Sequence, residues 1–339
     1  LAELRRAWGR GAGLAVRPVM FSVPHLLVSG VAETHWVVFT MLMVLTGLLL
    51  GWAYLGLTTV IYTLYPKSEE AIRRYRQLFL FTNLTLAGML ATFPWQGYGL
   101  WSICFSTLYL FASYFYYYFF IRYLNPVSIH RQSHTCFRAA LIYMVLSSAG
   151  PWALGAIMST FCPSSVWYRM SIYFYLHFQY NAWMFLGLLG ILLHYFESSG
   201  KRLPHTVFKH SMRWIHAGVI LSFLLSALWT KPSWIVNLIG GLGLLSIGLG
   251  LLPMGTWLWQ HQGHLLRSRR QSIVFFGMAI LLILKLILQG LAAFPYFSAL
   301  TVTYLDFVIG YLHWTFLGLV SLGLFLALSY TKLVSFPKP

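Results

Sequence analysis

The sequence predicts an all-α bundle of about nine transmembrane helices, and three observations lead to this fold class. Of the 339 residues, 59% are hydrophobic and only 9% are charged, whereas soluble domains carry about 25% charged residues. The apolar residues form runs long enough to cross the roughly 30 Å hydrocarbon core of a bilayer. The basic residues alternate between the two ends of these runs, which is the pattern that sets membrane topology.

Nine hydrophobic runs follow one another along the chain. They predict helices rather than strands, because none shows the alternation of a strand and an open sheet cannot span a bilayer. The expected helices cover about 34–60, 77–94, 99–121, 138–160, 168–195, 209–229, 234–258, 272–294 and 301–330. We therefore divide the chain into a basic N-terminal segment at the membrane interface (1–33), a transmembrane bundle (34–330) and a cytoplasmic tail (331–339).

The loops between the expected helices carry an uneven charge. Sixteen of the 23 Lys and Arg residues fall beside every second loop or in the C-terminal tail, whereas the opposite loops contribute only Arg169 and Lys231. By the positive-inside rule, the basic loops and the C-terminus are cytoplasmic, and we expect a multi-pass protein of the bacterial inner membrane. The net charge of +17 is then explained by the orientation of the protein in the membrane and by attraction to anionic lipids. No nucleic-acid partner is expected.

The N-terminal segment does not fit this charge pattern. It holds four arginines, although the topology places it on the outer side. A further helix before Thr34 would remove the conflict. Because the chain opens with Leu1 rather than Met, we expect residues ahead of it.

Several polar side chains fall inside the hydrophobic runs, where polar groups are costly unless they are paired or bind something. The most prominent stretch is YFYLHFQYNAW, residues 173–183, which carries His177. At 1.5 Å per residue, His177 and Lys285 lie about 13 Å, and His313 about 18 Å, from the outer ends of their helices. Three ionisable side chains on three helices are therefore expected in one layer of the membrane.

Other polar residues accompany these three. Lys285 and Gln289 are four residues apart on one helix face, and Asp306 and His313 are two turns apart on another. The remaining candidates come from the prominent stretch and are Gln179, Tyr180 and Asn181. We expect Lys285, Gln289, Asp306 and this trio to supply proton transfer or hydrogen bonds to a site. The alternative is that each group pairs across helices and only stabilises the bundle.

The histidines predict a cofactor. A neutral imidazole is a good ligand of haem iron, and two histidines from facing helices at one depth could hold a b-type haem edge-on. We expect His177 and His313 as these metal ligands, with His216 as a further cofactor-binding candidate. Copper is not expected because the chain has no adjacent His–His pair, and the three cysteines form no CxxC pair.

Five segments carry a family resemblance. They are GWAYLGL (51–57), GMLATFPWQGYGLWSICFSTL (88–108), YLHFQYNAW (175–183), LKLILQGLAAFP (284–295) and FVIGYLHWTFLGLVSLGLF (307–325). Their Gly- and Trp-punctuated pattern resembles the haem–copper oxidase subunit I superfamily, and most closely its short, uncharacterised bacterial relatives. The resemblance implies an oxidase-like bundle with one haem and a role in respiratory electron transport, or a bundle that has lost its cofactors.

Two departures limit this resemblance. No histidine stands two turns before the Gly51–Trp52 pair, where such relatives carry one, and no HPEVY-like pattern occurs. We therefore do not expect a complete oxygen-reducing centre.

Three functional classes stay open at this point. The first is a haem-binding protein with a redox or gas-related role. The second is a cofactor-free scaffold or accessory subunit of a larger membrane complex. The third is a proton-coupled transporter, although no inverted repeat is visible in the chain. No phosphate loop or HExxH motif is present, so the sequence does not assign an enzyme activity.

Overall fold

The computed structural model describes residues 46–97, 99–125, 131–160, 165–264, 269–303 and 305–331, and these residues form helices and turns with no strand. The first half of the described chain contains η2 (Thr46–Leu55), α4 (Gly56–Thr63), α5 (Glu69–Gln96), α6 (Leu100–Tyr123), α7 (Arg131–Ser147), α8 (Ala149–Thr160), α9 (Val166–Phe178), η4 (Gln179–Met184) and α10 (Phe185–Ser198). The second half contains α11 (His205–Ser222), η5 (Phe223–Thr230), α12 (Trp234–His261), η6 (Gln262–His264), α13 (Arg269–Leu291), α14 (Pro295–Thr303), α15 (Leu305–Trp314), η7 (Thr315–Val320) and α16 (Ser321–Tyr330).

Eight helical stretches among the described residues are long and apolar enough to cross a membrane. They correspond in order to the expected runs from 77–94 to 301–330, so the prediction of a multi-pass helical bundle is confirmed. The first expected run, 34–60, is described only from Thr46 onward and is helical to Thr63. The last run differs in one respect, because its first residues belong to the separate short helix α14 and the span itself begins at Asp306. The segment 1–33 and the tail beyond Thr331 lie outside the described residues.

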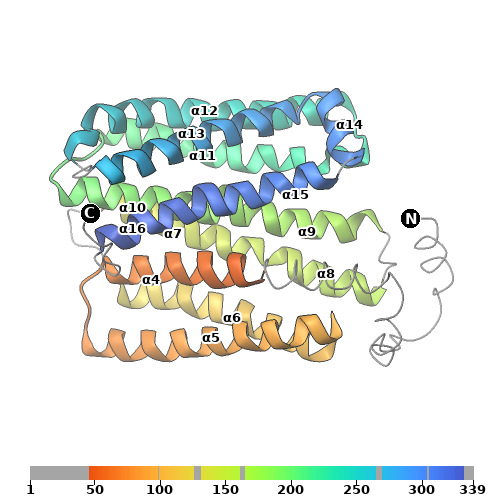
Figure 1. The fold of residues 1–339 in the computed structure, drawn as a ribbon, viewed down its shortest axis with the longest axis horizontal. Coiled ribbons are helices and arrows are strands. Elements are labelled where there is room, and N and C mark those ends of the chain that lie inside the picture. Colours follow the sequence, from red (N-terminus) through yellow and green to blue (C-terminus); the bar gives the residue numbers. More distant parts are fainter. Residues whose placement is uncertain are drawn as a thin grey trace.

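Successive spans run in opposite directions along the long axis of the bundle, as Figure 1 shows. The turn after α4, the end of α6, the turn after α10 and the end of α16 lie together at one end of the bundle. The turns that follow α5, η5 and α13 lie at the other end, beside α14. The first end carries the exposed basic residues Lys67, Arg122, Arg202 and Arg269. The bundle thus has one basic end, as the loop charges predicted.

The centre of the bundle is formed by η2, α4, one face of α6, α7, η4 and α10. Its largest fully buried side chains include Trp183, Tyr116, Phe120 and Phe137. By contrast, α13 exposes a row of isoleucines, among them Ile273, Ile280 and Ile287, each more than half exposed. An apolar row of this kind suits contact with lipid tails, because the tails are as apolar as the side chains.

A buried carboxylate fixes the start of α7. Glu197, at the end of α10, is 1% exposed. Its carboxylate accepts hydrogen bonds from the backbone N–H groups of Gln132 at 2.9 Å and Ser133 at 3.3 Å, and from the Ser133 hydroxyl at 2.6 Å. The first N–H groups of a helix lack partners within the helix and favour negative charge. Glu197 therefore joins α10 to α7 by satisfying them.

Helices α11 and α12 approach closely at glycines. A Cβ atom added to Gly243 would lie 2.5 Å from the backbone N of Ser222, and one added to Gly218 would lie 2.6 Å from the Gly243 carbonyl oxygen. Small residues let membrane helices pack with their backbones in near contact. This contact holds α11, and the η5 segment that continues it, in place beside the site described below.

Candidate functional site

The site begins where α11 changes its helical geometry. At Phe223 the backbone N–H donates to the carbonyls of Ile220 and Leu221 rather than four residues back to Val219. The chain continues as a 3₁₀ helix through η5. The Val219 carbonyl accepts a hydrogen bond from Nε2 of His177 on α9, at 2.8 Å. A change of backbone hydrogen bonding on one helix thus provides an acceptor for the buried histidine of another.

The Val219 bond places a proton on Nε2 of His177. A carbonyl can only accept, so Nε2 carries the proton, and in the neutral ring Nδ1 is then an acceptor. The amide nitrogen of Asn181 lies 3.1 Å from Nδ1, one helical turn along, where i and i+4 side chains meet. Asn181 therefore donates to His177, and its amide oxygen points the other way.

Lys285 on α13 completes a hydrogen-bonded chain. Its ammonium lies 2.6 Å from the Oδ1 atom of Asn181 and 3.1 Å from the Oε1 atom of Gln289. The Lys285 residue is 6% exposed, and these two partners are neutral amides. The chain Gln289–Lys285–Asn181–His177–Val219 connects α13, η4, α9 and α11 through groups whose donor and acceptor roles are all consistent.

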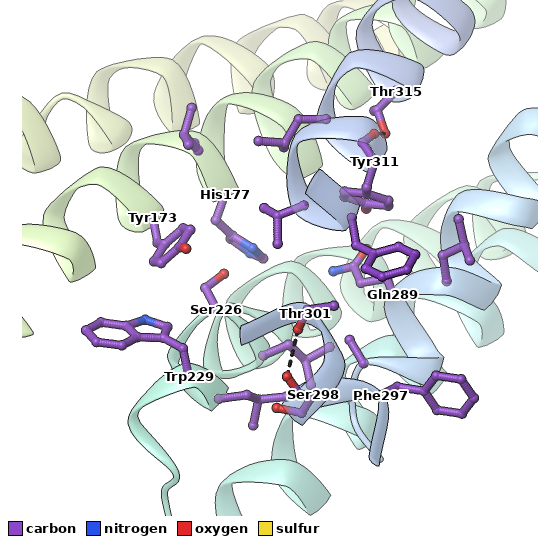
Figure 2. Close-up of a pocket in the computed structure, with 18 of the residues that line it drawn as sticks. Tyr173, His177, Ser226, Trp229, Gln289, Phe297, Ser298, Thr301, Tyr311 and Thr315 are labelled. Carbon is purple, nitrogen blue, oxygen red and sulfur yellow. Dashed lines mark hydrogen bonds between the residues drawn. The ribbon is translucent and has the colours of Figure 1, made fainter. Parts of the chain in front are cut away.

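A cavity of about 630 Å³ lies beside this chain. Its walls come from α9, η4, η5, α13, α14, α15 and the start of η7. His177, Asn181 and Gln289 line it, whereas Lys285 lies behind the two amides. Figure 2 shows the His177 ring and the Gln289 amide directed toward one another across the open space. Most of the remaining wall is aromatic or aliphatic and includes Tyr173, Trp229, Phe297, Tyr311 and Trp314.

Two charged residues mark the mouth of the cavity. Arg169, near the start of α9, and Asp306, in the first turn of α15, both line it and are both exposed. The Arg169 guanidinium lies over the Trp229 ring, 5.2 Å from the ring centroid. The start of α9 and the start of α15, which carry these two residues, lie at the end of the bundle opposite the basic loops, next to α14 (Figure 1).

The structure brings together part of the predicted set. His177, Asn181, Lys285 and Gln289 are linked by hydrogen bonds, and Tyr180 and Asp306 line the same cavity. Tyr180 also packs edge-on against Phe316, with ring centroids 4.2 Å apart.

Three predicted residues lie away from the cavity. His313 does not line it, and its Nδ1 contacts the Ile309 carbonyl of its own helix at 2.8 Å. His216 pairs with the Tyr143 hydroxyl at 3.1 Å, and Gln179 donates to the Ser147 hydroxyl at 2.9 Å. These two interactions are pairings between helices, the alternative interpretation of the polar groups. The seven-residue spacing of Asp306 and His313 does not bring the histidine to the cavity.

His177 does not fit a haem ligand in this arrangement. Both of its ring nitrogens already have protein partners, Val219 and Asn181. An imidazole must give one nitrogen to the metal and uses the other for a supporting hydrogen bond. Within the described residues, no group of three or more His, Cys, Asp or Glu side chains is arranged to hold a metal ion.

Several site residues carry no signal that sequence reasoning could use. The Val219 carbonyl is a backbone group, and Trp229 and Arg169 read as ordinary interface residues. Ser226, Ser298 and Thr301 line the cavity, but hydroxyls of this kind are common in membrane helices, where they bond to their own backbone. Thr301 does so with the Ser298 carbonyl at 2.8 Å (Figure 2).

No protein-family model matches this chain, and no curated protein or solved structure matches it either. The resemblance to haem–copper oxidase subunit I therefore stays a prediction from the sequence. The features that bear on function are the cavity and the hydrogen-bonded chain beside it.

Proposed function

We propose that this protein binds a small, mainly apolar organic molecule in its cavity and moves it between the bilayer or the aqueous phase and the cavity, as a membrane carrier does. The observation that carries the proposal is the cavity of about 630 Å³, which lies within the range of ligand pockets, roughly 300–1,000 Å³. It has the composition of such pockets as well. The walls are apolar and aromatic, and a few polar groups converge at one place.

The geometry of the wall helices supports movement. Three of the walls leave regular α-helical geometry beside the cavity, at the π-helical segments η4 and η7 and at the 3₁₀ segment η5. Segments of these kinds within longer helices often mark hinges and functional sites. A carrier needs such places, because its helices must bend or shift for a ligand to enter and leave.

The mouth of the cavity lies away from the basic end of the bundle. If the basic loops face the cytoplasm of a bacterial inner membrane, a ligand enters the cavity from the outer half. This orientation is part of the proposal. It predicts that the variant Asp306→Cys, which changes a residue at the mouth, is modified when a membrane-impermeant thiol reagent is added to intact cells.

The alternative function that the cavity allows us to test most directly is that of a cofactor-free scaffold. A scaffold has no need of an open, aromatic-walled space, so filling the space should leave it unaffected. Glycine 310 offers a direct way to fill it, because Gly310 lines the cavity and an added Cβ there meets no atom within 4 Å. Gly277 on α13 is equally unobstructed and does not line the cavity.

The test compares Gly310→Trp with Gly277→Trp in lipid nanodiscs by isothermal titration calorimetry. The probes are 4-phenylbutyrate, 4-phenylbutanamide and 4-phenylbutylammonium, which share an apolar aromatic body and differ in the head group. We expect at least one probe to bind saturably to the unmodified protein, about tenfold or more weakly to Gly310→Trp, and normally to Gly277→Trp. Absence of binding by all three, or equal binding to both variants, would overturn the proposal.

A further inference from the structure

The side-chain amides of Asn181 and Gln289 turn hydrogen-bond donors away from Lys285, and Lys285 is the cause. Its ammonium holds the amide oxygens of both Asn181 and Gln289. Each amide must therefore turn its nitrogen away from Lys285. The nitrogen of Asn181 uses one N–H on His177 and keeps a second, while that of Gln289 has two N–H groups with no acceptor among the described residues.

The orientation of Asn181 is fixed from both sides. Turning its amide over would set the NH₂ group against the ammonium of Lys285 and the oxygen against Nδ1 of His177. Nε2 already donates to the Val219 carbonyl, so Nδ1 could donate to that oxygen only in a doubly protonated, cationic ring close to the Lys285 ammonium. Both contacts would then be donor against donor or acceptor against acceptor, so the amide has one stable orientation.

The charges around the cavity leave one positive charge without a counterion. Arg169 and Asp306 at the mouth cancel formally. His177 is neutral, as its hydrogen bonds require. The ammonium of Lys285 is buried and held by neutral amides, and a buried charge is costly unless an opposite charge lies near. A ligand with a single negative charge at the amide nitrogens would bring the site to neutrality.

We propose, on the basis of the binding function proposed above, that the ligand is a monocarboxylate with an apolar body. Its carboxylate accepts from the amide N–H groups of Gln289 and Asn181, whose dipoles are aligned by Lys285 behind them. Its body packs against the aromatic wall that includes Tyr173, Trp229 and Phe297 (Figure 2). Lys285 acts as a positioning residue, because it orients the amides and supplies the charge without lining the cavity.

The test ranks the three phenylbutyl probes by affinity and repeats the titration with Lys285→Met. We expect 4-phenylbutyrate to bind about tenfold or more tightly than the amide or the ammonium compound. Lys285→Met should remove this preference and leave the affinity for 4-phenylbutanamide within about threefold. The matched control is Lys231→Met, which removes a positive charge from an exposed connection at the end of the bundle where the cavity opens. This variant should keep the preference for 4-phenylbutyrate.

A second variant keeps the test decisive if Lys285→Met does not fold. Gln289→Glu places a carboxylate of the protein beside Lys285, where it takes the place of the ligand's charge. It should weaken 4-phenylbutyrate about tenfold or more without weakening the amide. Dodecanoate is the further probe. Tighter binding of dodecanoate than of 4-phenylbutyrate would indicate a carboxylate from lipid, and weaker binding a carboxylate from the aqueous phase. The preference for an anion is tested by the three phenylbutyl probes.

The outcomes separate the two proposals. Equal affinities for the three head groups, with all binding lost in Gly310→Trp, would overturn the carboxylate proposal and leave the binding function standing. Tighter binding of the ammonium compound would do the same. If none of the three probes binds the unmodified protein, both proposals are overturned.

Discussion

Lys285 and His177 lie on different helices and are joined through one amide, that of Asn181, with contacts of 2.6 Å and 3.1 Å. The charged group donates to Asn181, and Asn181 donates to the ring. A buried cation therefore controls which protons a neutral histidine can hold, without touching it.

Asn181→Leu should lower the stability of the bundle. The substitution keeps the size of the side chain but leaves Lys285 with one acceptor fewer and Nδ1 of His177 without a donor. Each buried group left short of a partner costs about 1–3 kcal/mol. We expect a lower Tm for the protein in detergent.

The control for this variant is Asn83→Leu on α5. Asn83 bonds to the Phe79 carbonyl of its own helix at 2.8 Å, so its loss leaves no other side chain without a partner. A Tm decrease as large in Asn83→Leu as in Asn181→Leu would show that the hydrogen-bonded chain has no special part in stability.

Gly243→Ala should separate α11 from α12. Its Cβ would lie 2.5 Å from the backbone of Ser222, a distance that only a shift of the helices can relieve. Overpacking of this kind costs about 1–3 kcal/mol. Gly248→Ala on the same helix meets no atom within 4 Å and should be neutral or slightly stabilising. Thermal unfolding of the two variants side by side measures the difference, and equal Tm values would contradict the close approach.

Glu197→Ala should destabilise the bundle strongly. It removes three hydrogen bonds from the first turn of α7 and leaves buried N–H groups without a partner, each costing about 1–3 kcal/mol. Glu70→Ala is the control, because the Glu70 carboxylate is exposed. It lies 3.7 Å from Arg74 and accepts a hydrogen bond from the Tyr123 hydroxyl at 3.0 Å, and exposed interactions of this kind contribute little. The measurement is the Tm of each variant. A larger decrease for Glu70→Ala would contradict the capping role.

Visible spectra test the haem hypothesis directly. Haem held by His177 and His313 predicts a Soret band and an α band that vanish in His177→Ala. The hydrogen bonds of His177 predict spectra without these bands, because a ring nitrogen that binds iron must first release its partner. Reduced-minus-oxidised spectra of the purified protein and of His177→Ala and His313→Ala provide the measurement. A Soret band that depends on His177 would contradict the hydrogen-bonded chain.

The fold was largely predictable, because hydropathy and loop charge report on the same physical constraint. A helix that crosses lipid must be apolar for about 20 residues, and eight such stretches appear where the runs predicted them. The breaks within those helices were not predictable. The stretches that become η5 and η7 are apolar, and the stretch that becomes η4 is marked by its polar residues but not by any helix-breaking proline. The geometry of all three depends on what packs against them.

The sequence predicted part of the site, since His177 and Lys285 both contact Asn181, but it did not predict the direction of each side chain. Counting residues along a helix gives the position of His177, Lys285 and His313 along the membrane normal. It does not give the rotation of each helix about its axis. That rotation directs His177 and Lys285 toward Asn181 and leaves His313 off the cavity. The Val219 carbonyl could not have been found, since every residue has one.

The 3₁₀ segment η5 also determines how far the chain extends. A 3₁₀ helix rises about 2.0 Å per residue and an α-helix about 1.5 Å. The eight residues of η5 therefore cover about 4 Å more than they would in an α-helix. This gain equals the rise of nearly three α-helical residues. The added length brings Trp229 to the level of Arg169 before the chain turns at Lys231. Fewer residues than an α-helix would need are therefore enough to reach the edge of the cavity.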